Sequence, residues 1–388
     1  MTERDYTAHL KGPAAAIGAA AWNACANPSG RSDPHPFTRY EFFAALEESG
    51  SAVPRTGWQP VHLAIARGGR IAGLMPLYVK AHSQGEYVFD HAWADALERA
   101  GGNYYPKLQA CVPFTPVTGR RLLVADGADA AAIQAALLQA GAATVERLEC
   151  SSLHITFPIE DEWQAAGRCG YLLRTDRQFH WENRGYASFD EFLGELSSSK
   201  RKTLKKERAA VRAEGVEFDW LTGRDITEAH WDAFFEFYMD TGERKWGSPY
   251  LNREFFSRIG QTMSEQVLLV MARRGGKTIA GALNFFGDGV LYGRNWGCTE
   301  YVPFLHFEAC YYQAIDFAIA KGLAKVEAGA QGEHKLLRGY QPVPTYSAHF
   351  IAHDGLRQAV AHYLDAERAA IAANIEDLAQ AAPFKKGS

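Results

Sequence analysis

The chain has 388 residues, of which 47% are hydrophobic, so it can fill more than one hydrophobic core, and this excludes disorder as its default state. Its formal net charge is -4 at pH 7, which excludes a molecule that is basic as a whole and attracts nucleic acid or anionic membrane by overall charge. A local basic patch remains compatible with these numbers.

The first residues, MTERDYTAHLKGPAAAIGAAAW, are too weakly apolar to resemble a secretory signal peptide. No window approaches ~20 uninterrupted apolar residues, so we expect no transmembrane helix and a cytoplasmic protein. The six cysteines are scattered without a C-x-x-C pair, which predicts reduced thiols, without disulfide bridges or a zinc site.

A repeat organises the chain. The segments VHLAIARGGRIAGLMPLYV, from Val61, and VLLVMARRGGKTIAGALNFF, from Val267, follow the same pattern. Each predicts a β-hairpin with an apolar strand, a basic Gly-rich turn and a second strand that contains Ile-Ala-Gly. We interpret the next segments, EYVFDHAWAD and GVLYGRNWGC, as strands that end near Trp93 and Trp296. The sequence therefore predicts two copies of one domain.

Helical patterns flank the first hairpin. TRYEFFAALEES precedes it, and a loop with three prolines, YYPKLQACVPFTPVTGRRLLV, follows the aromatic segment. Then DAAAIQAALLQAG predicts a helix and ATVERLECSSLH a strand. In the region that joins the two copies, GYLLRTDRQFHWENRGY predicts a strand. SFDEFLGELSSSKRKTLKKERAAVRAEG then predicts a helical stretch with a basic middle. We place the domain boundary near Tyr186, which gives domains 1–185 and 186–388.

The second copy is more regular. The helices ITEAHWDAFFEFYMDT and NREFFSRIGQTM are expected before its hairpin, and HFEACYYQAIDFAIAKG is expected after it, stopped by Gly322. A strand, LAKVEAGA, and a short helix, QGEHKLLRG, follow. The last segment, GLRQAVAHYLDAERAAIAANIEDLAQAA, predicts one amphipathic helix that packs back across a domain.

In this order the elements of the second half resemble the GNAT-type N-acetyltransferase fold, an α/β fold with a mixed sheet, and HKLLRGYQP is similar to its closing helix and Gly-aromatic turn. Two such domains in tandem occur in the FemAB family of peptidyl transferases, and SSSKRKTLKKERAAVRAEGVEF is similar to the opening of the second domain there. The run GEYVFDHAWADALERAGGNYYPKLQACVPFTPVTG resembles bacterial FemAB-like proteins of peptidoglycan biosynthesis or recognition. The resemblance covers about His35 to about Tyr363 and implies two tandem GNAT-like domains with a C-terminal helix that packs back.

This resemblance implies an enzyme that transfers an acyl or aminoacyl group to an amine acceptor, such as a cell-wall precursor or a peptide, without a covalent enzyme intermediate. FemAB enzymes take the group from aminoacyl-tRNA, and single-domain relatives take it from acyl-CoA; either is a cosubstrate and not a permanently bound cofactor. Acyl-CoA enzymes cradle the pyrophosphate with a Gly-rich loop, whereas the matching TEYVPFLHFEAC contains no glycine, and Pro106 follows the two glycines of AGGNYYPKLQ. The donor therefore stays undecided.

Two other functions remain open from the sequence. One is an acyl-CoA-dependent small-molecule N-acetyltransferase. The other is a non-catalytic protein that recognises peptidoglycan or peptide fragments. A metal site is not expected, because the acidic and histidine residues lack ligand spacing such as His-x-x-x-His.

Three residues are candidates for the catalytic base. Asp90 and His91 end the predicted strand of the first copy, where the second copy has Gly293 and Arg294, and this asymmetry favours one site. Adjacent strand residues point to opposite faces, so His91 is alternatively a core histidine. Glu327 lies in a predicted strand, and an apolar sheet centre would raise its pKa.

Other residues are candidates for binding substrate. Lys107 and Tyr105 lie in an aromatic loop interrupted by proline. Arg294, near Trp296, suits a phosphate or carboxylate; alternatively it is a surface arginine paired with Glu300. The remaining candidates come from the short helix and its entrance, whose alternative role is to cap the domain, and they are Gln331, Glu333, His334, Lys335 and Arg338.

One basic run stands out. Six of the nine residues from Lys200 to Arg208 are Lys or Arg, and they are a candidate contact for tRNA. The alternative is a solvated helix face, since no aromatic residue interleaves with the run to stack on bases.

Overall fold

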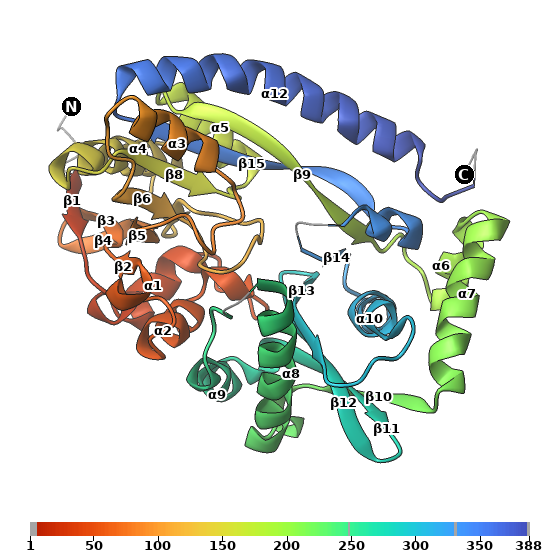
Figure 1. Cartoon of the computed structure of the whole chain (residues 1–388). Coiled ribbons are helices and arrows are strands. Elements are labelled where there is room, and N and C mark those ends of the chain that lie inside the picture. Colours follow the sequence, from red (N-terminus) through yellow and green to blue (C-terminus); the bar gives the residue numbers. More distant parts are fainter. Residues whose placement is uncertain (1–5, 247–248, 330–331, 386–388) are drawn as a thin grey trace. The chain divides into compact units, whose positions relative to one another are not determined.

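The computed structural model describes residues 6–246, 249–329 and 332–385 (Figure 1). The chain divides into two compact units, one formed by Met1–Asp176 with Pro344–Ala373, and the other by Arg177–Val343 with Asn374–Ser388. With the predicted division at Tyr186 the chain would pass once from one domain to the other, whereas it passes three times between these units. Residues 344–373, which we placed in the second domain, belong to the first unit.

The first unit holds two sheets. The strand order is β1-β3-β4-β7 in one, and the strands of the other that lie in this unit follow the order β15-β8-β6-β5-β2. The elements are β1 (Tyr6–Leu10), α1 (Ala19–Ala26), α2 (Tyr40–Glu48), β2 (Trp58–Pro60), β3 (Leu63–Arg67), β4 (Arg70–Met75), β5 (Leu77–Lys80), α3 (His91–Arg99), β6 (Lys107–Ala110), β7 (Leu123–Val124), α4 (Ala130–Arg147), β8 (Ser152–Thr156), α5 (Glu160–Arg168), β15 (Gln341–Ile351) and α12 (Asp354–Gln380).

The second unit has one sheet with the order β10-β11-β12-β13-β14-β9. Its elements are β9 (Leu172–Glu182), α6 (Phe189–Glu195), α7 (Ser198–Ala213), β10 (Val216–Leu221), α8 (Glu228–Trp246), α9 (Arg253–Thr262), β11 (Val267–Arg274), β12 (Lys277–Gly287), β13 (Val290–Cys298), α10 (Leu305–Phe307), the π-helix η6 (Glu308–Tyr312), α11 (Gln313–Ala320), β14 (Lys325–Glu327) and the 3₁₀ helix η7 (Glu333–Arg338).

The predicted repeat is visible in the strand pairing. Both hairpins form, β3 with β4 and β11 with β12, and each turns through two glycines with positive φ, at 57° and 77° in the first and 58° and 79° in the second. A two-residue turn with positive φ at both positions matches the twist of the strands, which explains the Gly-Gly pairs. The strands β5-β6-β8-β15 then repeat the antiparallel, parallel, antiparallel pattern of β12-β13-β14-β9.

The last strand of each unit comes from a distant part of the sequence. In the second unit, β14 pairs with β9, which precedes every other element of that unit. In the first unit, β8 pairs with β15, which follows almost the whole second unit along the chain. The two units therefore each complete their sheet with a strand that sequence order alone assigns elsewhere.

The two faces of the β5-β6-β8-β15 sheet differ in chemistry. One face carries apolar residues such as Leu108, Leu153 and Ile155, which pack against α4. The opposite face carries polar side chains that are at most 3% exposed, and we call it the polar face; its residues are Tyr78, Lys80, Lys107, Gln109, Ser152, His154, Thr156, Ser347 and His349. A polar sheet face is normally solvated, so its burial here requires internal partners.

Helices cover both faces of the second sheet. Buried side chains of α6, η6 and α11 pack with Leu268, Leu291 and Val326 on one face. On the other face α8 lies so close to β13 that a Cβ at Gly297 would come within 2.0 Å of the Phe237 carbonyl oxygen. Glycine is required there by this close approach.

Three predictions of local structure were wrong. EYVFDHAWAD is a loop followed by α3, because Asp90 is the residue before the helix and Trp93 and Leu97, one turn apart, bury the same face. Lys107 is the first residue of β6 and is fully buried, rather than part of a loop. In ATVERLECSSLH the helix α4 continues to Arg147 before β8 begins.

Other predictions are confirmed. The strands β9, β13 and β14 and the C-terminal helix lie where the sequence placed them, and α12 packs back through Leu356, Val360 and Leu364 against Trp93 and Leu97. The basic stretch after Tyr186 is helical, as two helices, α6 and α7. All six cysteines are free.

The packing of α12 gives a first prediction. Replacing Leu364, which is fully buried, by alanine should lower the free energy of unfolding of the first unit by about 2–5 kcal/mol, since it deletes buried methyl groups and leaves a cavity. Urea denaturation followed by tryptophan fluorescence measures this change. His362 is exposed on the same helix, and H362A should be within about 0.5 kcal/mol of the wild type; equal effects of the two variants would contradict the packing.

Candidate functional site

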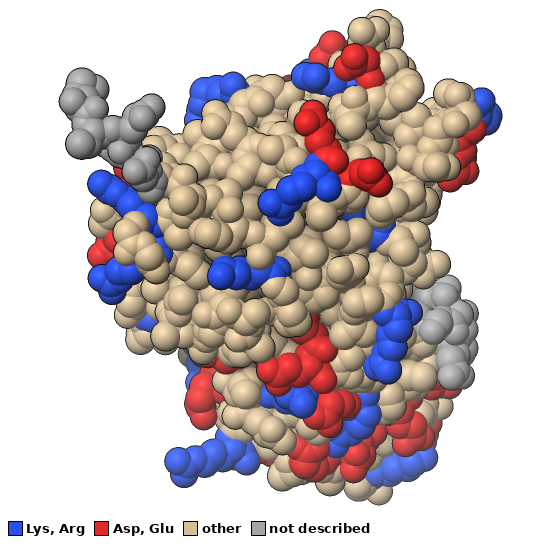
Figure 2. Space-filling model, turned by 90° about the vertical axis from the view of Figure 1, so that its left-hand side faces the viewer, with Lys and Arg blue, Asp and Glu red and all other residues tan. Residues whose placement is uncertain are grey.

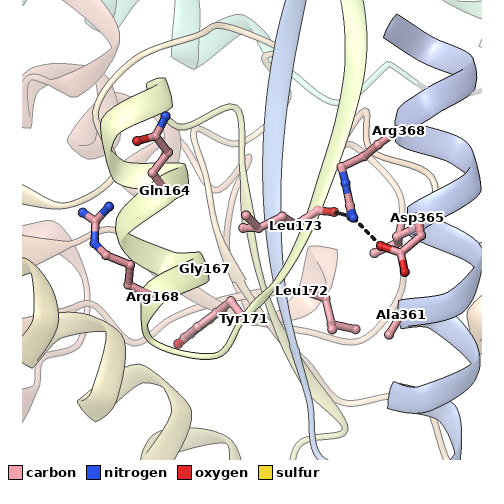
Figure 3. A pocket seen from close by; sticks show the side chains of 10 residues that line it. Gln164, Gly167, Arg168, Tyr171, Leu172, Leu173, Ala361, Asp365 and Arg368 are labelled. Atoms are coloured by element: carbon pink, nitrogen blue, oxygen red, sulfur yellow. Dashed lines mark hydrogen bonds and ion pairs between the residues drawn. The ribbon is translucent and has the colours of Figure 1, made fainter.

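One pocket of about 600 Å³ lies in the first unit between α5, the start of β9 and α12 (Figure 3). Of its two basic side chains, Arg168 and Arg368, the second donates to the carbonyl oxygen of Leu173 at 2.5 Å and pairs with Asp365. These charges therefore neutralise each other, and the pocket brings together none of the residues that the sequence singles out.

The carboxyl ends of two parallel strands in the second unit do bring such residues together. The pairing of β13 with β14 stops at Tyr292 and Glu327, after which β14 ends and β13 continues to Cys298 with β12 as its partner. Arg294 and Trp296 lie on this continuing part of β13, and η7 follows the loop after β14. Ligands in open α/β sheets bind outside the carboxyl ends of strands.

Lys335 is the most unusual group of this region. It is 2% exposed, and its Nζ donates to the carbonyl oxygen of Gly329 at 2.9 Å. Burial lowers the pKa of Lys335 to about 7, and the positive charge of Arg294 acts in the same direction. A buried lysine that is half neutral near pH 7 is suited to take up a proton.

Glu327 lies at the end of β14 and is 1% exposed. Its Oε1 is 3.2 Å from Nζ of Lys325 and 3.9 Å from Nε2 of His180 on β9. Burial lowers the pKa of His180 to about 4, opposed by Glu327 and reinforced by Lys325, Lys335 and Arg294. His180 is therefore neutral at physiological pH, and Glu327 has a cation within ion-pair distance.

An aromatic group surrounds His334. The hydroxyl of Tyr311 is 3.0 Å from Nε2 of His334, and the rings of His306 and Phe307 lie 6.3 and 5.6 Å from its ring. Trp296 extends the group, with its ring 5.4 Å from His306. Rings in tilted contact of this kind form a wall with polar edges.

Arg338 links η7 to the basic helix. Its Nη2 lies 3.0 and 2.9 Å from the two carboxylate oxygens of Glu207 on α7, its Nη1 donates to the carbonyl oxygen of His334 at 2.8 Å, and its guanidinium lies 3.4 Å from the ring centroid of Phe307. Tyr312 also donates to Glu207. These partners fix η7 on α7, so Arg338 positions the segment that carries His334 and Lys335.

The first unit contains a second polar cluster, centred on Lys107. Its Nζ donates to Oδ2 of Asp90 at 2.5 Å, Oε2 of Glu86 at 2.6 Å and Oγ of Ser83 at 2.8 Å. The hydroxyl of Tyr105 is 2.9 Å from the same Oγ. Burial opposes ionisation of Asp90, but the charge of Lys107 prevails and holds the pKa of Asp90 well below its usual range. Asp90 is therefore a fixed anion and a weak base.

Two histidines continue this cluster along the polar face. Tyr104 donates to Asp90 at 2.7 Å, and its oxygen is 3.1 Å from Nε2 of His154. Nδ1 of His154 lies 2.7 Å from Nδ1 of His349, whose Nε2 is 2.9 Å from Oγ of Ser347. Burial lowers the pKa of His154 to about 3 and that of His349 well below its usual value. Both rings are neutral, and one Nδ1–H joins them.

The structure separates the predicted residues into these two clusters. Asp90, Lys107 and Tyr105 lie in the first unit; Arg294, Trp296, Glu327, His334, Lys335 and Arg338 lie in the second. His91 belongs to neither, because it is exposed and stacks on Phe89 with ring centroids 6.2 Å apart. Glu300 pairs with Arg274 and Lys277, so the alternative partner for Arg294 is engaged elsewhere. Gln331 and the side chain of Glu333 lie outside the described residues.

Sequence reasoning missed Glu86, His154, His349 and Glu207. A signal for the histidines was present, since both occur as Ser-x-His in a strand, in SLHIT and SAHFI. In a strand this spacing puts serine and histidine on one face, and Ser152 and Ser347 do bond to the histidines two residues on.

Comparison with known proteins decides the family. A family model described as peptidoglycan biosynthesis/recognition, FemAB-like, matches residues 14–386. The chain belongs to the FemAB-like family. No curated protein matches it.

Solved structures show the fold of this FemAB-like protein. It is similar to the crystal structure of FemX, with a TM-score of 0.54 and 12% identity over 89% of this chain and 98% of that chain. L-PGS from Bacillus licheniformis matches with a TM-score of 0.51 and 11% identity over 83% and 93%. The C-terminal domain of a putative lysylphosphatidylglycerol synthetase from Agrobacterium fabrum matches with a TM-score of 0.52 and 8% identity over 89% and 96%. The predicted tandem GNAT-type α/β fold is thereby confirmed.

The neutral histidine pair predicts a pH dependence. His349 stays neutral in the folded protein, whereas the unfolded chain binds a proton below pH ~6.5, so the folded state loses stability as pH falls below that value. The variant H349N keeps a donor near the Nδ1 position but does not titrate. Its free energy of unfolding relative to the wild type should rise by about 1.4 kcal/mol between pH 7.5 and 5.5.

Urea denaturation at the two pH values measures this difference, and other titrating groups cancel because they are common to both proteins. The exposed variant H362A is the control and should show less than a third of this change. A constant difference between wild type and H349N would mean that His349 is not buried as a neutral ring.

Proposed function

We propose that the protein transfers an acyl or aminoacyl group to the amine of an acceptor, and that Lys335 removes the proton from that amine. The observation that carries this proposal is the buried amine of Lys335, with a pKa of about 7, at the carboxyl ends of the parallel strands β13 and β14. An acceptor amine is an ammonium ion near pH 7, so it must lose a proton before it can attack a carbonyl carbon.

The chemical step follows from this arrangement. Neutral Lys335 takes a proton from the acceptor ammonium, and the amine then attacks the carbonyl of the donor ester or thioester. Arg294, whose positive charge already acts on Lys335, is placed to hold an anionic group of a substrate or the developing oxyanion. Trp296, His306 and His334 provide a wall for the substrates. As the amide forms, the second proton of the attacking nitrogen passes to the leaving alkoxide or thiolate, and Lys335 then returns its proton to solvent.

Aminoacyl-tRNA is the donor we favour. The segment after β13, Thr299–Cys310, contains no glycine, so this unit lacks the Gly-rich loop that cradles the pyrophosphate of coenzyme A. A related structure is named for lysylphosphatidylglycerol synthesis, which attaches an aminoacyl group. The family description supports a cell-wall precursor or peptide as acceptor. An acyl-CoA-dependent N-acetyltransferase and a recognition protein without catalysis are the alternatives.

The helix α7 is the proposed contact for tRNA. Of its basic run, Lys202, Lys205 and Lys206 are exposed, while Arg208 is engaged with Glu308 and Asp316. On the face of the molecule drawn in Figure 2, by contrast, basic and acidic side chains are intermingled.

Among the described residues no helix has the length and hydropathy of a membrane span.

The role of Lys335 predicts a specific pH profile. Because the base must be neutral, the rate of aminoacyl transfer should rise with pH through about 7 and then level off. K335M should lower kcat by about 10²-fold or more, and K335R, which keeps the charge but cannot give up its proton, should be equally impaired. Single-turnover transfer from charged tRNA to an amine acceptor measures both effects.

Lys321, an exposed lysine after α11, provides the control, and K321M should keep the rate and the profile of the wild type. Full activity of K335M, or a profile without the limb near pH 7, would remove Lys335 from the mechanism. Transfer from acetyl-CoA but not from charged tRNA would favour the N-acetyltransferase.

The proposed tRNA contact predicts a change in salt dependence. The triple variant K202A/K205A/K206A should weaken binding of charged tRNA, and the slope of log K against log salt should become shallower by roughly 2–3, since each phosphate contact contributes about 0.7–0.9. Filter binding at 50–200 mM KCl measures the slope. The triple variant K277A/K321A/K385A removes the same charge from other exposed positions, and an equal change there would mean that α7 has no special role.

A further inference from the structure

The polar face of the first unit and the loop beside it contain hydrogen-bond acceptors that no donor reaches. Among the described residues of this network, three buried side-chain atoms have no hydrogen-bond partner, and all three are acceptors: Oε1 of Glu86, Oδ1 of Asp90 and Oε1 of Gln109. The three residues are at most 4% exposed. Buried acceptors without a donor are costly, so a ligand or water is expected to complete them.

The neighbouring lysines cannot supply the missing donors. Lys107 already uses its three N–H bonds on Ser83, Glu86 and Asp90. Nζ of Lys80 forms an ion pair with Oε1 of Glu86 at 3.7 Å, which is beyond hydrogen-bond distance, and it lies 3.6 Å from the ring centroid of Trp58. The donors must therefore come from outside the network.

The repeat places these acceptors at a meaningful position. Across the parallel pair and the closing strand of the first unit, Gln109, His154 and His349 form a row on β6, β8 and β15. The corresponding row in the second unit is Tyr292, Glu327 and His180 on β13, β14 and β9, beside Lys335. The unsatisfied acceptors thus lie where the other copy has its candidate active site.

We propose that the first unit carries a second site, which binds a primary ammonium group through hydrogen bonds to Oε1 of Glu86 and the two other unsatisfied acceptors. A primary ammonium offers three N–H donors and a positive charge, which match three acceptors of which two belong to carboxylates. This site is distinct from that of Lys335, and its ligand class is an amine-bearing compound.

The electrostatic setting of Glu86 suits the binding of an ammonium group. Burial raises the pKa of Glu86 to about 7; Lys107 and Lys80 act against this, and Asp90 adds to it. Tyr104 and Cys111 also sense the charge of Glu86. Near neutral pH the carboxyl group is therefore half protonated, and binding of an ammonium favours its ionised form.

The ligand reaches the acceptors from the side of segment 81–90, which carries Ser83, Glu86 and Asp90. This segment has no helix or strand, Tyr87 has a left-handed φ of 62°, and Phe89 is 58% exposed. A non-glycine residue with positive φ is strained, so displacement of the segment releases strain as it opens the polar face.

Calorimetric titration of the full chain with ethylammonium chloride at pH 7.0 tests the proposal, without any acyl donor and in two buffers that contain no primary amine and differ in ionisation enthalpy, phosphate and MOPS. We expect saturable binding with release of about half a proton per ligand, since half of the Glu86 carboxyls must lose a proton. Tetramethylammonium, which has no N–H donor, should not bind. E86Q should bind at least tenfold more weakly and release no proton.

Two further variants keep the test decisive. E98Q changes an exposed glutamate of α3 and should match the wild type. Q109M removes one acceptor without a change of charge and should weaken binding several-fold while proton release persists, with circular dichroism confirming that both E86Q and Q109M are folded. Absence of binding, equal binding by E86Q, or binding of tetramethylammonium would overturn the proposal, and each leaves transfer through Lys335 untouched.

Discussion

The ion pairs of Lys107 with Asp90 and Glu86 allow the first unit to bury a polar sheet face. A buried lysine without carboxylate partners would lose its proton. Without the lysine, each of the two buried carboxylates would take up a proton. Here the lysine stays charged, and Asp90 remains ionised through its contact with it. Tyr104 and the two neutral histidines then carry the hydrogen-bond chain across β8 and β15.

The second unit also buries a lysine, which lies on η7 and not on a strand. Lys335 has one backbone carbonyl as hydrogen-bond partner and a neighbouring arginine, so burial and repulsion both favour its neutral form. The same residue type is thus a fixed cation in one copy and a titrating amine in the other. Perturbation of this second kind is typical of functional sites, which is why we assign proton transfer to Lys335 rather than to Lys107.

More of the fold than of the candidate site could be predicted from the sequence. The two hairpins could be predicted because Gly-Gly turns and apolar alternation are local signals. Arg294, Trp296 and Lys335 could be singled out because the first two lie in a predicted strand and Lys335 follows one. Asp90 and His91 were misplaced, since a short aromatic segment before a helix has the composition of a strand. The partners of Lys107 are residues that only the folded sheet brings together, so no short sequence pattern around Lys107 predicts its burial. The membership of β15 in the first unit is equally non-local.

The pairing of β8 with β15 has a consequence for biosynthesis. His154 and His349, which touch across these strands, are 195 positions apart. At a translation rate of about 5–20 residues per second, the ribosome needs roughly 10–40 s to make the intervening chain. During that interval β8 is an uncovered edge with a polar and an apolar side, the kind of surface that recruits chaperones or mispairs. The first unit therefore cannot complete its sheet before most of the second unit has been made, so strict domain-by-domain folding from the N-terminus does not apply to this protein.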